Sequence, residues 1–187
     1  MILRGDSMLT KEDYKNLLVE VKSEFPQFEI VKKSDSSLMK TIDIILKIVS
    51  FGQTKNFMQD FITTIGDKIY VPPIWDAYSL STKAITVRHE RVHMRQAKRI
   101  GKFLFSFAYI MLPFPIVFAY FRMKFEKEGY EESLRAYHEY YGTKFFTPAL
   151  KESVIKHFTT SEYFWMWPWR SQIEKWYDNF VEKITKK

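Results

Sequence analysis

The sequence predicts one predominantly helical α+β domain over residues 1–187. Most apolar residues recur three or four positions apart, as in amphipathic helices, and one short β-branched run lies between turn residues. Hydrophobic residues make up 46% and charged residues 27%, which is typical of a folded chain and excludes a mainly disordered one. A chain of 187 residues suits a single domain and is short for two. We expect a core over about 40–140 and an aromatic, helical C-terminal extension over 145–187.

Amphipathic spacing indicates the first two helices. Apolar residues recur at helical spacing over residues 9–24, where Thr10 is followed by acidic residues that favour a helix start. A second helix is predicted over residues 38–49, and Gly52 is expected to end it.

A single short strand is predicted at Ile69–Val71, between the turn residues Gly66-Asp67 and a Pro-Pro pair. Proline has no backbone N–H to donate to a neighbouring strand. Because Pro72 follows at once, we expect this strand to lie at the edge of the sheet.

Residues 103–121 carry no charge and are numerous enough to cross a membrane. Pro113 and Pro115 divide this segment into two legs of about ten residues, each about 15 Å long, whereas a bilayer core is about 30 Å thick. We therefore expect a hairpin here, then a long helix over 116–140 and a last helix around 172–184.

The third predicted helix, which starts at Ser79 or Ser81, carries the arrangement H-E-x-x-H in His89, Glu90 and His93. Residues at i and i+4 lie one above the other on a helix, so two imidazoles can bind one zinc ion from the same side. Glu90 then lies beside the metal ion, where a carboxylate can take a proton from a water molecule. The chain has no Cys, so any further ligand must be a His or a carboxylate.

Zinc in a hydrolase needs a third protein ligand, and the long helix offers several carboxylates. Glu126 and Glu128 point about 200° apart on a helix, so at most one of them faces the two His residues. We favour Glu126, because Gly129 shares its face and a small residue lets two helices approach closely. Glu128 and, more weakly, Glu131 remain open as alternatives.

The zinc hypothesis also restricts the topology. A single membrane span over 103–121 would place His93 and Glu126 on opposite sides of a bilayer, where they could not share an ion. A hairpin returns the chain to the side that it left. The plentiful aromatic residues are then expected to form the core between the two helices that carry the site.

These residues resemble the gluzincin metallopeptidases, in which H-E-x-x-H on one helix is joined by a Glu from the next. Gly129 stands at the small position of that second motif, and Tyr130 stands where the family has an Asp that orients a zinc-bound His. The predicted core is also similar to short gluzincin-like proteins of bacteria and their phages. The resemblance implies a small zincin-like fold, a Zn²⁺ ion held by His89, His93 and Glu126, and peptidase activity.

We therefore expect a zinc metalloendopeptidase-like hydrolase whose partner is a peptide or protein substrate, with Glu90 as the catalytic general base. The strand Ile69–Val71 is expected to border the cleft and to hold an extended peptide by main-chain pairing. The alternative is a membrane-associated or virion-associated structural protein with a vestigial zinc site, in which the apolar hairpin contacts lipid.

The charge balance of 29 Lys and Arg against 22 Asp and Glu gives +7, which would suit an anionic partner. Basic residues occur in ones and twos rather than in an arm or stripe, so nucleic-acid binding is not expected. No apolar run of signal-peptide length follows Met1, which favours a cytoplasmic location. Peripheral membrane contact through 103–121 is compatible with the sequence but not favoured, and the oligomeric state stays open.

Overall fold

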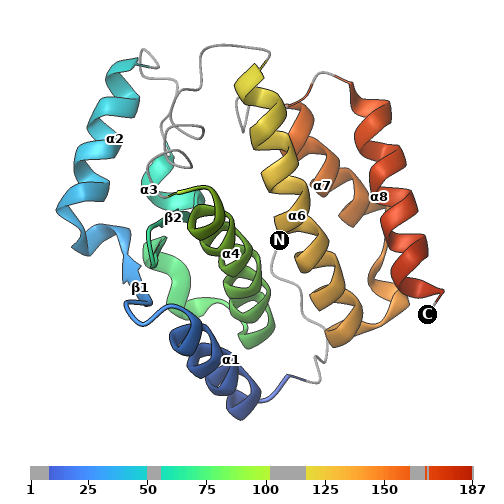
Figure 1. The fold of residues 1–187 in the computed structure, drawn as a ribbon, viewed down its shortest axis with the longest axis horizontal. Coiled ribbons are helices and arrows are strands. Elements are labelled where there is room, and N and C mark those ends of the chain that lie inside the picture. The colour runs from blue at the N-terminus through green and yellow to red at the C-terminus, as the bar shows by residue number, and fades with distance from the viewer. Residues whose placement is uncertain (1–8, 50–55, 102–116, 161–166, 168, 187) are drawn as a thin grey trace.

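The computed structural model describes residues 9–49, 56–101, 117–160, 167 and 169–186 (Figure 1). Along the chain the elements are α1 (Lys11–Glu24), β1 (Glu29–Lys32), η1 (Lys33–Asp35), α2 (Ser37–Val49), α3 (Phe57–Asp60), β2 (Thr63–Ile65), β3 (Lys68–Val71), η2 (Pro73–Ala77), α4 (Leu80–Ile100), α6 (Val117–Tyr141), η3 (Thr143–Phe145), α7 (Pro148–Thr159) and α8 (Arg170–Thr185). The described chain is predominantly helical with one small sheet. This confirms the α+β class that the sequence predicts.

Helices α1, α2, α4, α6 and α8 correspond to the five helices that the sequence predicts. Helix α1 begins as expected, because Thr10 accepts a hydrogen bond from the Asp13 backbone N–H and the Asp13 carboxylate accepts one from the Thr10 backbone. Helix α4 begins after Ser79, whose hydroxyl accepts from the Thr82 N–H. Gly52 lies outside the described residues.

The sheet has three strands in the order β1-β3-β2. Strand β1 is parallel to β3, with Ile30 opposite Ile69, and β2 is antiparallel to β3, with Thr64 opposite Ile69. A two-residue turn joins β2 to β3, and its Gly66 adopts φ 62°, which glycine accommodates without strain. Strands β1 and β2 are three or four residues long, and the sequence analysis misses both.

The prediction that Ile69–Val71 forms an edge strand is wrong, because β3 is the central strand of the described sheet. Pro72 lies just beyond the last ladder residue, where Lys32 pairs with Val71. Each residue of β3 therefore keeps its backbone N–H. The proline limits the length of the strand and not its place in the sheet. Strand β2, which lies next to α4, is an edge strand among the described residues.

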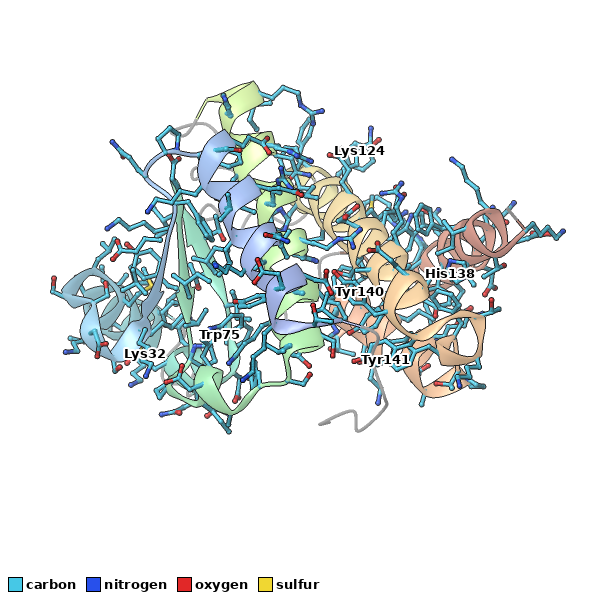
Figure 2. The ribbon with its side chains drawn as sticks, turned by 90° about the horizontal axis from the view of Figure 1, so that it is seen from below. Lys32, Trp75, Lys124, His138, Tyr140 and Tyr141 are labelled. Carbon is cyan, nitrogen blue, oxygen red and sulfur yellow. The ribbon has the colours of Figure 1, made fainter. Side chains whose placement is uncertain are left out.

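Helix α4 occupies the middle of the molecule, with the sheet and α1 on one side and α6 on the other (Figure 2). Towards the sheet and α1, its Val87 and Met94 belong to a buried cluster with Val21, Ile69 and Val71. Towards α6, its Ala84 and Ile85 pack against Ala136 and Tyr140. Packing on two different faces fixes the position of α4 relative to both neighbours.

The expectation that aromatic residues fill the space between α4 and α6 holds only in part. The contact combines Ala84, Ile85 and Ala136 with Tyr140, and Tyr137 and Tyr141 pack against these residues. Most of the buried aromatic residues of the C-terminal part lie on the far side of α6, where α7 and α8 cover it with Phe158, Tyr177 and Phe180. Helix α7 is not among the predicted helices, although the sequence contains signals for its start: Thr147 caps it and Pro148 occupies its first position.

The uncharged segment 103–121 lies mostly outside the described residues, including the predicted hairpin at Pro113 and Pro115. Among the helices that the structure describes, none combines the length and the hydrophobicity that crossing a membrane requires.

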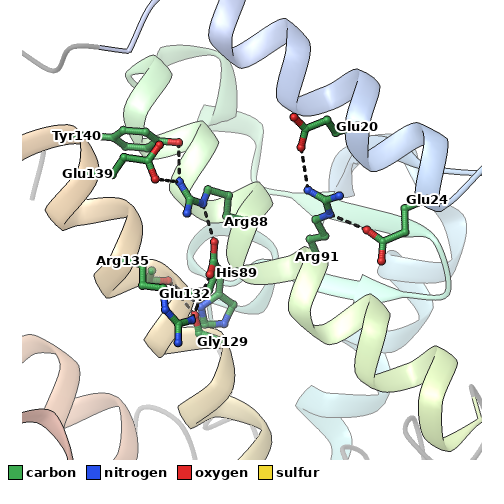
Figure 3. Close-up of polar contacts among 11 residues, drawn as sticks. Glu20, Glu24, Arg88, His89, Arg91, Gly129, Glu132, Arg135, Glu139 and Tyr140 are labelled. Carbon is green, nitrogen blue, oxygen red and sulfur yellow. Dashed lines mark hydrogen bonds and ion pairs between the residues drawn. The ribbon is translucent and has the colours of Figure 1, made fainter. Parts of the chain in front are cut away.

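Ion pairs hold α1 against α4 (Figure 3). Glu24 of α1 accepts hydrogen bonds from Arg91, at 2.8 Å, and from two nitrogens of Arg95, each at 2.7 Å. The bonds to Arg95 and Arg91 lower the pKa of Glu24 to about 2, against the opposing effect of its partial burial. Glu20 makes a single longer contact of 3.2 Å with Arg91.

We expect Glu24→Gln to lower the free energy of unfolding at neutral pH by about 1 kcal/mol, because it breaks a multidentate, partly buried pair. The pKa of Glu24 lies near 2 when folded and near 4.5 when unpaired. The stabilisation is therefore present above pH 4.5 and is lost as the pH falls towards 2. Urea titrations of both proteins across this range measure the effect. Glu20→Gln, the control, should change stability less, and a cost at Glu24 that stays constant with pH would contradict the assignment.

Candidate metal centre

Three side chains from two helices converge where α4 passes α6. Nε2 of His89 lies 3.0 Å from Nε2 of His93, and Oε2 of Glu126 lies 3.6 Å and 3.8 Å from these two nitrogens. His89 and His93 are one helical turn apart on α4, and Glu126 comes from α6. Within the described residues, these three are the His and carboxylate side chains that lie close enough together to share a metal ion. We call them the ligand group. The structure thus brings together the three residues that the sequence predicts as metal ligands.

The spacing of the three atoms matches a small divalent ion. Distances of 3.0, 3.6 and 3.8 Å define a triangle whose circumscribed circle has a radius of about 2.0 Å, close to ordinary Zn–N and Zn–O bond lengths of about 2.0 to 2.2 Å. The side chains are mostly buried, with 15% of His89, 6% of His93 and 13% of Glu126 exposed. Two imidazoles and one carboxylate form a donor set that zinc favours, and a zinc ion held by these three side chains would have a position left for a reactant.

Gln96 fixes which ring nitrogen of His93 carries the proton. Its amide nitrogen donates to the Phe125 carbonyl at 3.1 Å and to Glu128 at 2.9 Å, so its amide oxygen is directed at His93. That oxygen lies 2.8 Å from Nδ1 of His93 and can only accept. Nδ1 of His93 therefore carries the proton, and Nε2 offers a lone pair to the site.

Ser133 does the same for His89. The Ser133 hydroxyl donates to the Gly129 carbonyl one turn earlier on α6, and its oxygen lies 3.0 Å from Nδ1 of His89. Because the hydroxyl proton is directed at Gly129, the serine oxygen accepts from Nδ1, and Nε2 of His89 is left as an acceptor. Such outer partners set the tautomer and the direction of imidazole ligands in metal sites.

Without a cation, three electron-rich atoms would face one another in a mostly buried space, which is electrostatically unfavourable. The pKa values of the site residues follow from this crowding. Burial alone would lower the pKa of His89, but the hydrogen bond that the protonated ring would donate to Glu126 and the negative charges of Glu90 and Glu126 outweigh it and raise that pKa. Burial alone would raise the pKa of Glu126, yet His93, His89 and Arg122 hold it well below its usual range.

Gly129 allows the two helices to meet at this point. A Cβ atom built on Gly129 would lie 2.8 Å from both Cε1 and Nε2 of His89, closer than real carbon contacts allow. Figure 3 shows the His89 ring lying against this residue. The close approach that the sequence analysis expects of Gly129 is therefore present, and its neighbour is the ring that supplies a ligand nitrogen.

Glu90 lies on the sheet side of this group. It is 8% exposed, and its Oε2 accepts a hydrogen bond of 2.7 Å from the Thr64 hydroxyl of β2. That bond fixes one carboxylate oxygen and ties α4 to the edge strand. The negative charge of Glu90 also contributes to the raised pKa of His89.

The alternative third ligands point elsewhere. Glu128 accepts from Gln96 and lies 3.6 Å from Arg99. Glu131 accepts from the indole N–H of Trp176 on α8. Each carboxylate is therefore occupied away from the two His side chains.

Tyr130 meets His89 through its ring, edge to face with centroids 5.1 Å apart. Ser133 therefore takes the orienting place that the resemblance gives to the position of Tyr130.

Two contributors were missed as partners of the ligands, although one left a signal in the sequence. Gln96 stands three residues after His93, a spacing at which helical side chains meet. Ser133 stands seven residues after Glu126 and contacts a ligand of another helix. No spacing rule within one helix could reveal that contact.

Comparisons with protein-family models, with curated proteins and with solved structures find no match for this chain.

We expect the ligand group to bind one zinc ion per chain, and His93→Ala and Glu126→Ala each to reduce bound zinc to near background. Glu128→Ala tests the alternative third ligand and should retain zinc, because the Phe125 carbonyl still accepts from the Gln96 amide and keeps its oxygen directed at His93. Metal analysis of the purified proteins after equilibration with zinc measures the difference. Loss of zinc in Glu128→Ala together with retention in Glu126→Ala would overturn the assignment of the third ligand.

Gly129→Ala should weaken zinc binding by at least about tenfold, because the added methyl group pushes the His89 ring out of position. Competition with a chromophoric chelator measures the affinity. Lys124→Ala, on the same helix, controls for a general effect of the substitution on folding. Unchanged zinc affinity in Gly129→Ala would show that the ring has room to move.

Proposed function

We propose that the protein is a zinc-dependent peptidase in which His89, His93 and Glu126 hold the metal ion and Glu90 acts as the general base. The observation that carries the proposal is the convergence of three lone pairs at a spacing of about 2.0 Å from a common point. Gln96 and Ser133 support it, because each accepts from Nδ1 of one imidazole and thereby directs Nε2 of that ring towards the other two side chains.

The placement of Glu90 supports hydrolysis over a purely structural metal site. A bound zinc ion would lower the pKa of a water molecule and polarise a substrate carbonyl. Glu90 follows His89 directly, and the Thr64 hydroxyl holds one of its carboxylate oxygens. In the proposed reaction the other oxygen of Glu90 takes the proton of the attacking water and passes it to the leaving amine nitrogen. Water thereby adds across the amide bond to give a carboxylate and an amine.

The proposed peptide-binding edge moves from β3 to β2. Thr64 of β2 contacts Glu90 directly, and the side of β2 away from β3 pairs with no strand of the described chain. An extended peptide added along Thr63–Ile65 would form backbone hydrogen bonds next to the general base. In this proposal the strand that pairs with the peptide is β2, in place of Ile69–Val71.

We expect Glu90→Gln to bind zinc as the wild type does and to lose at least about a hundredfold in peptide cleavage, because a neutral amide cannot accept the proton of water. A mixed-sequence fluorogenic peptide library reports cleavage, and metal analysis reports zinc. Glu131→Gln, a carboxylate of α6 outside the group, should leave cleavage unchanged. Equal cleavage by Glu90→Gln and wild type, or absence of zinc from wild type, would exclude this function.

A further inference from the structure

Helix α2 presents an apolar face to solvent. Leu38, Ile44, Ile45 and Ile48 are 46%, 58%, 52% and 70% exposed. At 100° per residue these four side chains fall within an arc of about 120°, in which the exposed Thr41 also lies with its hydroxyl donating to the Ser37 carbonyl. Scattered exposed aliphatic side chains are ordinary, whereas a gathering of four on three helical turns indicates an interaction surface.

The opposite side of α2 is already used for packing. Met39 is fully buried and forms a cluster with Phe57 and Tyr70, against which Ile42 and Leu46 pack. Figure 1 shows α2 at the outer edge of the molecule, on the far side of the sheet from α6, α7 and α8. The helix is therefore held by one side, and the apolar face is directed outwards.

The charges beside this face are positive. Lys40 and Lys47 lie within about 60° of one border of the apolar arc, and both are exposed. The one carboxylate of α2, Asp43, has only 12% of its side chain exposed and pairs with Lys47. Burial lowers the pKa of the nearby Lys33 to about 7, and the charge of Asp43 opposes that shift.

We propose that the exposed face of α2 docks on an anionic lipid surface, with Leu38, Ile44, Ile45 and Ile48 entering the headgroup region and Lys40 and Lys47 contacting the anionic headgroups. An apolar helical face bordered by lysines is the pattern of helices that lie in the membrane interface. A second copy of α2 would offer these lysines no exposed carboxylate. The net charge of +7 favours the same partner. This inference goes beyond the proposed function and does not depend on it.

The test is co-sedimentation of the full chain with vesicles of equal parts phosphatidylcholine and phosphatidylglycerol. We expect wild type to sediment with these vesicles and to remain in solution with phosphatidylcholine alone. Ile44→Gln with Ile48→Gln should weaken binding by at least about tenfold, because two apolar side chains no longer leave water. Lys40→Gln should weaken it roughly fivefold through the loss of one charge near the surface. Val19→Gln is the matched control, since Val19 is 61% exposed on α1 and should not matter.

Circular dichroism verifies that the variants keep their helices, which is expected because both Ile positions are exposed and glutamine favours helices. Wild type that stays in solution with anionic vesicles would overturn the proposal. So would a double glutamine variant that sediments like wild type, or equal binding to both kinds of vesicle. A wild-type dimer that the same double substitution dissociates, measured by light scattering, would assign the face to a second copy instead.

Discussion

The contact between the His89 ring and the backbone of Gly129 sets the distance between α4 and α6, and with it the distances from Glu126 to His89 and His93. Neither helix is free to adjust at this point. The sheet and α1 hold α4 through Val87 and Met94, while α7 and α8 hold α6 through residues such as Leu134. Two cores on opposite sides therefore press the helices together, and the ligand atoms are positioned by packing before any ion is bound. Such preorganisation lowers the cost of ordering the ligands.

Much of the fold could be predicted because the long helices have strong apolar periodicity. The pairing of His89 with His93 could also be predicted, because residues four apart are neighbours on any helix. Elements of three or four residues could not be found this way, and β1 and β2 are of that length. The edge position predicted for β3 is wrong because a proline next to a strand indicates where the ladder ends, and does not indicate which strands flank it.

The contacts that other residues make with the ligand group could be predicted only in part. The choice of Glu126 over Glu128 rests on helical phase, which the sequence contains. The contact of Ser133 with His89 depends on how far α6 is shifted along α4, and the sequence does not contain that shift. For the same reason Tyr130 could be placed next to the site, but its packing through the ring, between His89 and Phe158, could not be anticipated.

Helix α4 is enclosed by α1, the sheet and α6, and this has a consequence for how the gene can vary. Of its 21 residues, the exposed ones are Arg95, Lys98 and Arg99, all near its C-terminal end. The other positions are buried or half-buried against α1, the sheet or α6. Mutational drift in this helix is thus confined to its last turns, and a random library would recover folded variants there far more often than around His89.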